Sequence, residues 1–430
     1  MKKTKAILLA VMVMPVGPAA RVINHDNDDP TLLAPGQRIE INLKTLDARS
    51  RRSVPQKLIP WSDVGWKANK GLVSERYNDA NFEKLEGWGA KHDYLNQHSA
   101  ASVLNMDSWN RDRGIAALSP AEKYDLLVGT VENGLAQNIG DFLDKSIGHD
   151  SAFPSWWGLC EGSAPASVFY PEPVQKVVLH SEAYNVDIPF YAPDVKGLAT
   201  MLWSRFNTNL NLPESGTECK AGDEPSCFDT NPASFHASVH HFLDLSPGIL
   251  IGEMDPSPVV WNFPLVSYSE TYYRPDKGAT KRAPDLASAT IAVSDWAADP
   301  RKATRSPGTL FLVGVKMDIS YGVNQAERAP NEGSSKRKIN TRTLAYELEL
   351  DENYTMLGGE WVAGSHPDLL WTVPKGTVPD SPSESLLPPR GGENGVIPRS
   401  WAAAARASAA KLTPLRRVVD LLIQRSARGR

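Results

Sequence analysis

The chain has 430 residues, with 46 Lys and Arg against 50 Asp and Glu, so its formal net charge is −4. Hydrophobic residues make up 41% and charged residues 22%, which is typical of a globular protein with a sizeable core. Proteins that bind nucleic acid through its phosphates normally carry a basic excess, which this composition lacks. No segment has the roughly 20 consecutive apolar residues that cross a bilayer. These observations exclude a polytopic membrane protein and disfavour a dedicated nucleic-acid binder.

The first 20 residues have the pattern of a secretory signal peptide. Lys2 and Lys3 precede an apolar run over residues 6–16, and small residues follow up to Ala20, where a signal peptidase could cut. We therefore predict export, with the protein secreted or located in the periplasm or at the cell surface. Residues 21–60 are polar and rich in turn-forming residues, and we expect them to form a mobile N-terminal segment or a pro-segment.

Two helices are predicted between residues 119 and 143. Ser119 can cap the first helix, Pro120 suits its first position, and Glu122 can complete a capping box. Apolar residues follow at helical spacing, and Gly129 and Gly134 interrupt the pattern. We expect these helices to serve packing.

Helices and strands alternate irregularly over the rest of the chain. Segments 201–206 and 233–243 have helical patterns, whereas segments 249–254, 310–319 and 344–350 have the patterns of strands. Such a mixture of helices and non-adjacent strands predicts an α+β fold.

The C-terminal region is predicted to consist of a linker and a helix. Residues 374–398 are rich in Pro, Ser and Gly and are expected to form the linker. Residues 401–430 are basic, and Leu415, Val418, Val419 and Leu422 follow an i, i+3, i+4, i+7 pattern. We expect this amphipathic helix to dock on the body of the protein or to stay partly ordered, and we favour both over membrane contact.

The chain has three cysteines, and export changes how they are interpreted. Cys219 and Cys227 lie eight residues apart in a polar loop, so we predict a disulfide, worth roughly 2.5 kcal/mol in the chain-entropy model. Cys160 is then unpaired, and it is either a buried inert residue or a reactive thiol.

The neighbours of Cys160 favour a reactive thiol. Gly158 precedes it and small residues follow at 162–164, as expected for a loop that enters a closely packed helix. A thiol at a helix N-terminus or beside an imidazolium loses its proton more easily and becomes a nucleophile. Trp157 is a candidate wall of an acyl-binding slot, and Pro165 argues against a straight helix.

A nucleophilic thiol needs a base, and His236 is the best placed of the nine histidines. It lies in a predicted helix that starts at Asn231-Pro232, and His240 lies on the same face at i+4. The two imidazoles could also bind a metal. Because the sequence lacks a glutamate beside His236, as in the H-E-x-x-H motif, we favour acid–base chemistry.

A third residue would orient the imidazole. Glu253, Asp255 and Asn262 are the candidates, because they follow the histidine segment and lie at or beyond a predicted strand. The order Cys, His, then acid or amide matches both transglutaminase-like and papain-like sites.

Several of these segments resemble the transglutaminase elicitor family, which comprises cell-wall transglutaminases of oomycetes and bacterial relatives. The resemblance covers about residues 60–372. It rests on SPAEKYDLLVG (119–129), SWWGLCEGSAPAS (155–167), DTNPASFH (229–236), VWNFP (260–264) and the region 348–371. VWNFP looks like the surface peptide through which plants sense these proteins, so we expect Asn262 to be exposed.

The resemblance implies a papain/transglutaminase-like core, a catalytic domain over residues 61–372, and a secreted protein-glutamine γ-glutamyltransferase. Cys160 would be the nucleophile, His236 the general base and acid, and Asp255 the orienting residue. We favour Asp255 over Glu253 because Asp255-Pro-Ser resembles the Asp-Pro-Thr turn of transglutaminase cores. The substrates would be proteins with accessible Gln and Lys. Calcium dependence is implied, although no ligand loop can be named.

Two alternatives to this function remain open. The first is a papain-like peptidase or amidase, in which Asn262 replaces Asp255. The second is a catalytically silent surface or effector protein. The family usually has His, Gly and Trp after the cysteine, whereas this chain has Glu161, Gly162 and Ser163. A carboxylate beside a thiol raises its pKa, which favours the silent alternative.

Overall fold

The computed structural model describes most of the chain. The residues that it describes are 23, 27–49, 51, 53–54, 60–146, 148–149, 154–206, 210–217, 229–254, 261–324, 337–362, 366–379, 381, 383–388 and 391–427. Three predictions fall outside these residues: the signal peptide, the disulfide between Cys219 and Cys227, and the position of Asp255.

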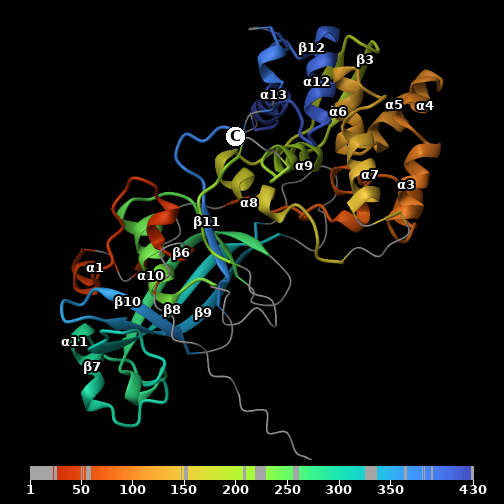
Figure 1. The fold of residues 1–430 in the computed structure, drawn as a ribbon. Coiled ribbons are helices and arrows are strands. Elements are labelled where there is room, and N and C mark those ends of the chain that lie inside the picture. Colours follow the sequence, from red (N-terminus) through yellow and green to blue (C-terminus); the bar gives the residue numbers. More distant parts are fainter. Residues whose placement is uncertain are drawn as a thin grey trace, which may run out of the picture.

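The fold is α+β, as predicted, and Figure 1 shows most of its helices gathered on one side and its long strands on the other, together with α1, α10 and α11. The helices are α1 Leu43–Arg49, α2 Ala80–Glu83, α3 Trp88–Gln97, α4 Ala100–Leu104, α5 Ser108–Ala117, α6 Pro120–Val128, α7 Leu135–Ser146, α8 Cys160–Phe169, α9 Ala192–Leu202, α10 Pro232–His240, α11 Leu286–Ala289, α12 Ala402–Ala409 and α13 Arg416–Ser426. The strands are β1 Ser53–Val54, β2 Val177–Ser181, β3 Val186–Phe190, β4 Glu214–Gly216, β5 Leu250–Glu253, β6 Asn262–Tyr273, β7 Thr290–Ala292, β8 Phe311–Gly322, β9 Ile339–Leu350, β10 Met356–Trp361, β11 Leu369–Thr372 and β12 Val396–Ile397.

A curled antiparallel sheet forms one half of the molecule. Its strand order is β10-β9-β8-β6-β5-β11-β4, with β1 paired to β6 and β7 paired to β8. The alternation predicted from the sequence is confirmed in β8 and β9, since Val313, Val315 and Met317 are buried on one face, as are Tyr346 and Leu348. Helix α10 packs against β9 and β10 and helps to cover this hydrophobic core.

The helical half surrounds a second core that includes α6, α7 and α9. The predicted capping box is confirmed, because the Ser119 side chain accepts from the Glu122 N–H and the Glu122 carboxylate accepts from the Ser119 N–H. Asp125 then caps α7 by accepting from the Leu135 and Ala136 N–H groups at 2.7 and 2.9 Å. The two helices predicted in this region are therefore present, and side chains of the first cap the second.

The N-terminal segment packs more tightly than its composition indicated. We expected residues 21–60 to be mobile, but the described part contributes Leu33, Leu43 and Leu46 to the core beneath the sheet. Leu43 and Leu46 share one face of α1, and their side chains are at most 1% exposed. A few well-spaced leucines are enough to anchor an otherwise polar segment.

The C-terminal region also packs on the body of the protein. The predicted linker includes β12, which pairs in parallel with β2 and buries Ile397 completely. Of the two possibilities that we favoured for the amphipathic helix, the structure shows docking, because Val418, Val419 and Leu422 of α13 are fully buried and α13 packs against α9. None of the described helices is long and apolar enough to cross a membrane.

Candidate active site

Two glycines fix the position of Cys160 at the start of α8. A Cβ on Gly158 would lie 2.5 Å from the Gly65 carbonyl oxygen, and a Cβ on Gly162 would lie 2.2 Å from the Thr200 carbonyl oxygen. The backbone therefore makes close contacts on both sides of Cys160, with α8 packed against α9. The helix begins at Cys160 and continues through Pro165.

The thiol of Cys160 faces the amide of Asn262, the first residue of β6. The Asn262 Nδ2 atom lies 3.8 Å from the Cys160 sulfur, and the Asn262 Oδ1 atom accepts from the Trp371 indole N–H at 2.7 Å. Because an indole N–H can only donate, Trp371 fixes the orientation of the amide. The NH₂ group of Asn262 consequently points toward the sulfur.

Asn262 is buried, with 6% of its surface exposed, whereas we expected it in an exposed peptide. Its two side-chain hydrogen bonds explain this difference, since both Cys160 and Trp371 lie inside the protein. The sequence placed Asn262 among the candidates for orienting an imidazole, but here it contacts the thiol directly. Nothing in the sequence connected Trp371 with the site.

The Cys160 thiol is protonated at neutral pH in this conformation. Burial, and secondly the Glu161 charge, raise the pKa of Cys160 to about 11, although hydrogen bonds from Asn262 act in the opposite direction. Burial also raises the pKa of the Glu161 carboxyl, to about 7, so this group loses its proton near neutral pH. The expectation that Glu161 raises the pKa of the thiol agrees with the structure, although burial contributes more.

The Cys160 thiol is largely buried in this conformation, with 7% of the residue exposed. Asn262 and Ser163 of α8 also line a small cavity of about 10 Å³ between α8 and the start of β6. Trp157, the predicted wall of an acyl slot, is half-buried against the helical core and accepts through its backbone from the Ala68 N–H. Its role in substrate binding stays a prediction.

Glu253 lies beside this site. It ends β5 and is the direct cross-strand partner of Asn262 in the antiparallel pair. Directly opposite residues in such a pair project their side chains to the same face of the sheet, with Cβ atoms about 4.5–5.5 Å apart. Glu253 is completely buried, and its carboxylate accepts from the Trp261 N–H at 3.1 Å.

His236 occupies a different place from the one we expected. Its Nδ1 atom lies 2.9 Å from the Tyr346 hydroxyl and 3.8 Å from the Glu270 carboxylate. Glu270 is eight residues from Asn262 along β6, which is roughly 26 Å at the usual strand rise of about 3.3 Å. The buried Nε2 atom of His236 has no hydrogen-bond partner in the described structure. The thiol and this imidazole therefore do not meet.

The environment of His236 keeps its ring neutral. Burial, and secondly the nearby His240 ring, lower the pKa of His236 well below its ordinary value. His240 in turn lies 3.1 Å from both the Glu270 carboxylate and the Tyr268 hydroxyl. The sequence had indicated the His236–His240 pair, but it gave no signal that Glu270 and the tyrosines complete this network.

Among the described residues, no group of acidic side chains alone lies close enough to share the calcium ion that the family resemblance implied, and calcium dependence stays a prediction. Three groups of side chains lie close enough to share a metal ion, and each contains at least one imidazole and at most two carboxylates. Calcium takes six to eight oxygen ligands, which none of these groups provides. We therefore derive no step that involves calcium. The groups are His92, Asp144 and His149; His236, His240 and Glu270; and Asp229, His366 and Asp368.

Comparisons with known proteins agree with the resemblance seen in the sequence. The family model described as "Transglutaminase elicitor" matches residues 35–383. The crystal structure of the GP42 transglutaminase from Phytophthora sojae is similar with a TM-score of 0.55 and 16% sequence identity, over 94% of this chain and 99% of that chain. At this identity the likeness concerns the fold. The search of curated proteins gives no match.

Proposed function

The chain belongs to the transglutaminase elicitor family, and on this premise we propose that it is a protein-glutamine γ-glutamyltransferase whose nucleophile is the Cys160 thiol. The observation that carries the proposal is the contact between the sulfur and the Asn262 amide. A cysteine in the first turn of a helix, facing an oriented N–H donor on a strand, has two of the features that favour a thioester-forming nucleophile. The papain/transglutaminase-like core is part of this proposal.

The reaction would proceed in two steps. The Cys160 sulfur attacks the carboxamide carbon of a substrate glutamine, the carbon–nitrogen bond breaks, and ammonia leaves with the thiol proton. A lysine amine then attacks the thioester carbon, the carbon–sulfur bond breaks, and the sulfur regains a proton as the isopeptide bond forms. The Asn262 NH₂ group would donate to the thiolate or to the oxyanion beside it. Substrates would therefore be proteins with accessible Gln and Lys.

The base that takes the thiol proton is not assigned by the described contacts. His236 as the base and Asp255 as its orienting residue stay predictions from the sequence. For His236 to act, α10 and α8 would have to approach each other, because His236 lies near Glu270 whereas Cys160 contacts Asn262, eight residues earlier in β6. Glu253 is the carboxylate whose side chain shares a sheet face with Asn262, so it is the second candidate.

The silent surface or effector protein is the second candidate function, and the state of the thiol favours it. A buried sulfur with a pKa of about 11 is a poor nucleophile at neutral pH. In our proposal this state is the closed form, which must open before a substrate glutamine can reach Cys160. Export stays a prediction, because the first 20 residues lie outside the described structure.

An amine-incorporation assay separates these functions. The full-length protein is incubated with a glutamine-containing protein and a labelled primary amine at pH 8, beside a Cys160→Ala variant. We expect incorporation by the wild type and none by the variant. If ammonia appears without amine incorporation even at high amine concentration, the protein is a hydrolase. If neither product forms, the silent alternative holds.

A further inference from the structure

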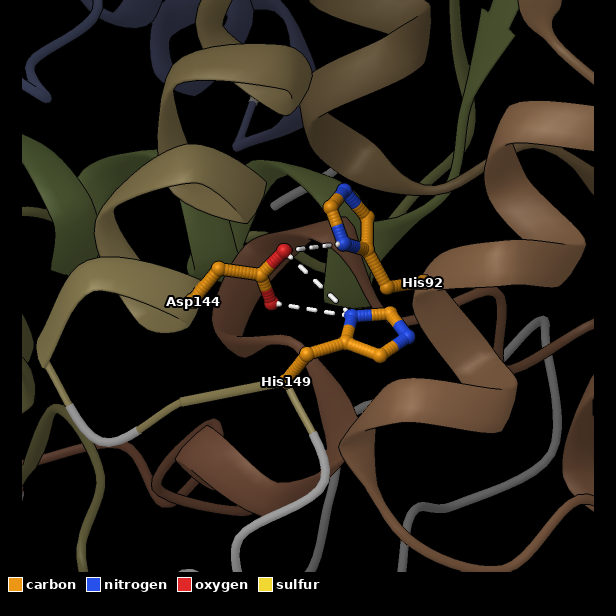
Figure 2. Close-up of side chains that lie close together, drawn as sticks. All are labelled: His92, Asp144 and His149. Carbon is orange, nitrogen blue, oxygen red and sulfur yellow. Dashed lines mark hydrogen bonds and ion pairs between the residues drawn. The ribbon is translucent and has the colours of Figure 1, made fainter.

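Two histidines and an aspartate, none of them part of the Cys160 site, converge in the helical half of the molecule (Figure 2). His92 belongs to α3, Asp144 to the last turn of α7, and His149 to the chain just after α7. The His92 Nδ1 atom lies 2.9 Å from Asp144 Oδ2, and the His149 Nδ1 atom lies 3.4 Å from each oxygen of the same carboxylate. Three elements thus bring three metal-binding side chains to one point.

These contacts are poor hydrogen bonds. The His92 Nδ1 atom is buried, and although it lies close to Asp144 it has no partner with hydrogen-bond geometry. The His149 contacts, at 3.4 Å, are longer than the usual range of about 2.7–3.2 Å. Figure 2 shows the three side chains converging, with a ring nitrogen of each histidine facing the Asp144 carboxylate.

Neighbouring groups hold the three side chains in place. The Trp88 indole N–H donates to Asp144 Oδ1 at 2.6 Å, and the Trp88 ring stacks on the His92 ring at 4.9 Å. On the far side of His149, Nε2 lies 3.5 Å from the Asp93 carboxylate. A carboxylate at Nε2 favours the tautomer that carries its proton there, which leaves the Nδ1 lone pair for a metal.

We propose that His92, Asp144 and His149 bind a divalent transition-metal ion of the zinc class. In a tetrahedral zinc site with bonds of about 2.0–2.1 Å, the ligand atoms lie about 3.3 Å apart. The separations of 2.9 and 3.4 Å around Asp144 match this geometry within a few tenths of an ångström. Two imidazoles and one carboxylate form a donor set that suits zinc and not calcium.

The site has room for a fourth ligand from solvent. The side chains of Asp144 and His149 are 29% and 36% exposed, whereas that of His92 is 12% exposed. An ion can therefore enter without unfolding the helical half, and a water molecule can complete the tetrahedron. Bound metal would tie α3 to the end of α7 and fix His149, which lies eleven residues before Cys160 in the chain.

The other two groups are weaker candidates. The rings of His236 and His240 each contact a tyrosine hydroxyl, and both rings are buried in the core beneath the sheet. The contacts of His366 with Asp229 and Asp368 are 3.6 and 3.9 Å long. The first group is closed to solvent, and the second is less compact than the group around Asp144.

Zinc titration of the full-length protein tests this proposal. After treatment with a chelator, the protein is titrated with Zn²⁺ at pH 7.5 by calorimetry and by competition with a coloured chelator. We expect an ion bound at this site with about micromolar affinity or better. The affinity should fall as the pH is lowered from 7.5 to 5.5, because protonated imidazole cannot bind a metal. Absence of Zn²⁺ binding by the wild type would overturn the proposal.

Three variants locate the ion. His149→Ala removes a partly exposed ligand and should weaken Zn²⁺ binding by more than tenfold, and Asp93→Asn should weaken it by about 10–100-fold through His149 alone. His180→Ala is the matched control, because His180 pairs with the exposed Asp187 at 2.8 Å without a third ligand. Unchanged affinity in both His149→Ala and Asp93→Asn would place the ion elsewhere and contradict the proposal. Should His149→Ala fail to fold, Asp93→Asn alone decides.

Discussion

Replacing Glu161 by glutamine should make the Cys160 thiol more acidic and more reactive. At pH 8, a thiol with a pKa of about 11 is ionised in about one molecule in a thousand, against about one in four for an ordinary cysteine with a pKa of about 8.5. Burial contributes most to this shift, and the Glu161 charge comes second. Glu161→Gln removes the charge at nearly constant volume. Each unit by which the pKa of the thiol falls raises the thiolate fraction tenfold at pH 8.

The effect of Glu161→Gln on the reactivity of the thiol should depend on pH. The pKa of Glu161 is about 7, so its carboxylate is charged at pH 8 and largely neutral below about pH 6. The wild type and Glu161→Gln should therefore differ in reactivity above pH 7 and converge toward pH 6. If the group that was replaced were ionised throughout this pH range, the reactivities of the wild type and the variant would differ equally at every pH.

The rate of alkylation by iodoacetamide between pH 6 and 11 measures the reactivity of the Cys160 thiol. Mass spectrometry of the peptide that contains Cys160 distinguishes its alkylation from that of Cys219 and Cys227. Glu352→Gln is a suitable control, because Glu352 is exposed in the turn between β9 and β10. A wild-type Cys160 that titrates at or below pH 8.5 would refute the account of a buried, protonated thiol. Equal rates for Glu161→Gln and wild type at pH 8 would refute the role of the Glu161 charge.

Two further predictions concern stability and are measured by urea unfolding. Lys123 and Asp194 form an ion pair at 2.6 Å in which both side chains are completely buried. Lys123→Ala should lower the free energy of unfolding by about 3–5 kcal/mol, because it leaves a buried carboxylate without its cation; a loss below about 1 kcal/mol would contradict this. Leu422→Ala on α13 should cost about 2–5 kcal/mol, whereas Gln424→Ala, at an exposed position of the same helix, should change stability by less than about 0.5 kcal/mol. Equal effects of the two would mean that α13 does not stabilise the body of the protein.

Local signals predicted several regular elements well, although of the helix predicted over residues 201–206 only 201 and 202 are helical, at the end of α9. Ser119, Pro120 and Glu122 form the capping box that the sequence indicated, and β8 and β9 bury the alternating residues that marked them as strands. Each of these patterns depends only on residues that are close together in the chain, so it can be recognised from the sequence alone. The docking of α13 was predictable for the same reason, because its apolar residues recur at helical spacing.

The packing of polar segments could not be predicted in this way. Leu43 and Leu46 hold α1 in the core beneath the sheet, and Ile397 holds β12 beside β2, although composition indicated a mobile segment and a linker. In both cases one or two apolar side chains pack against residues that are distant in the sequence. The composition of a segment does not predict such long-range contacts.

The candidate site was predicted in part. Cys160 lies in the first turn of a closely packed helix, as its glycine-rich neighbours indicated. The sequence order Cys, His, then acid or amide suggested that His236 lies beside the thiol, but order along the chain does not fix which part of a long strand each residue contacts. The contact from Trp371 to Asn262 joins residues 109 positions apart, and no local pattern marks it.

Detection of an acyl group on Cys160 tests the central claim most directly. The full-length protein is incubated with a glutamine-containing peptide in the absence of amine, stopped in acid, digested, and analysed by mass spectrometry. We predict that the Cys160 peptide gains the mass of the glutamine peptide less ammonia, and that adding a primary amine removes this adduct and yields the amide. If the amide forms while Cys160 carries no adduct, or if Cys160→Ala forms it equally well, the assignment of Cys160 as the nucleophile is wrong.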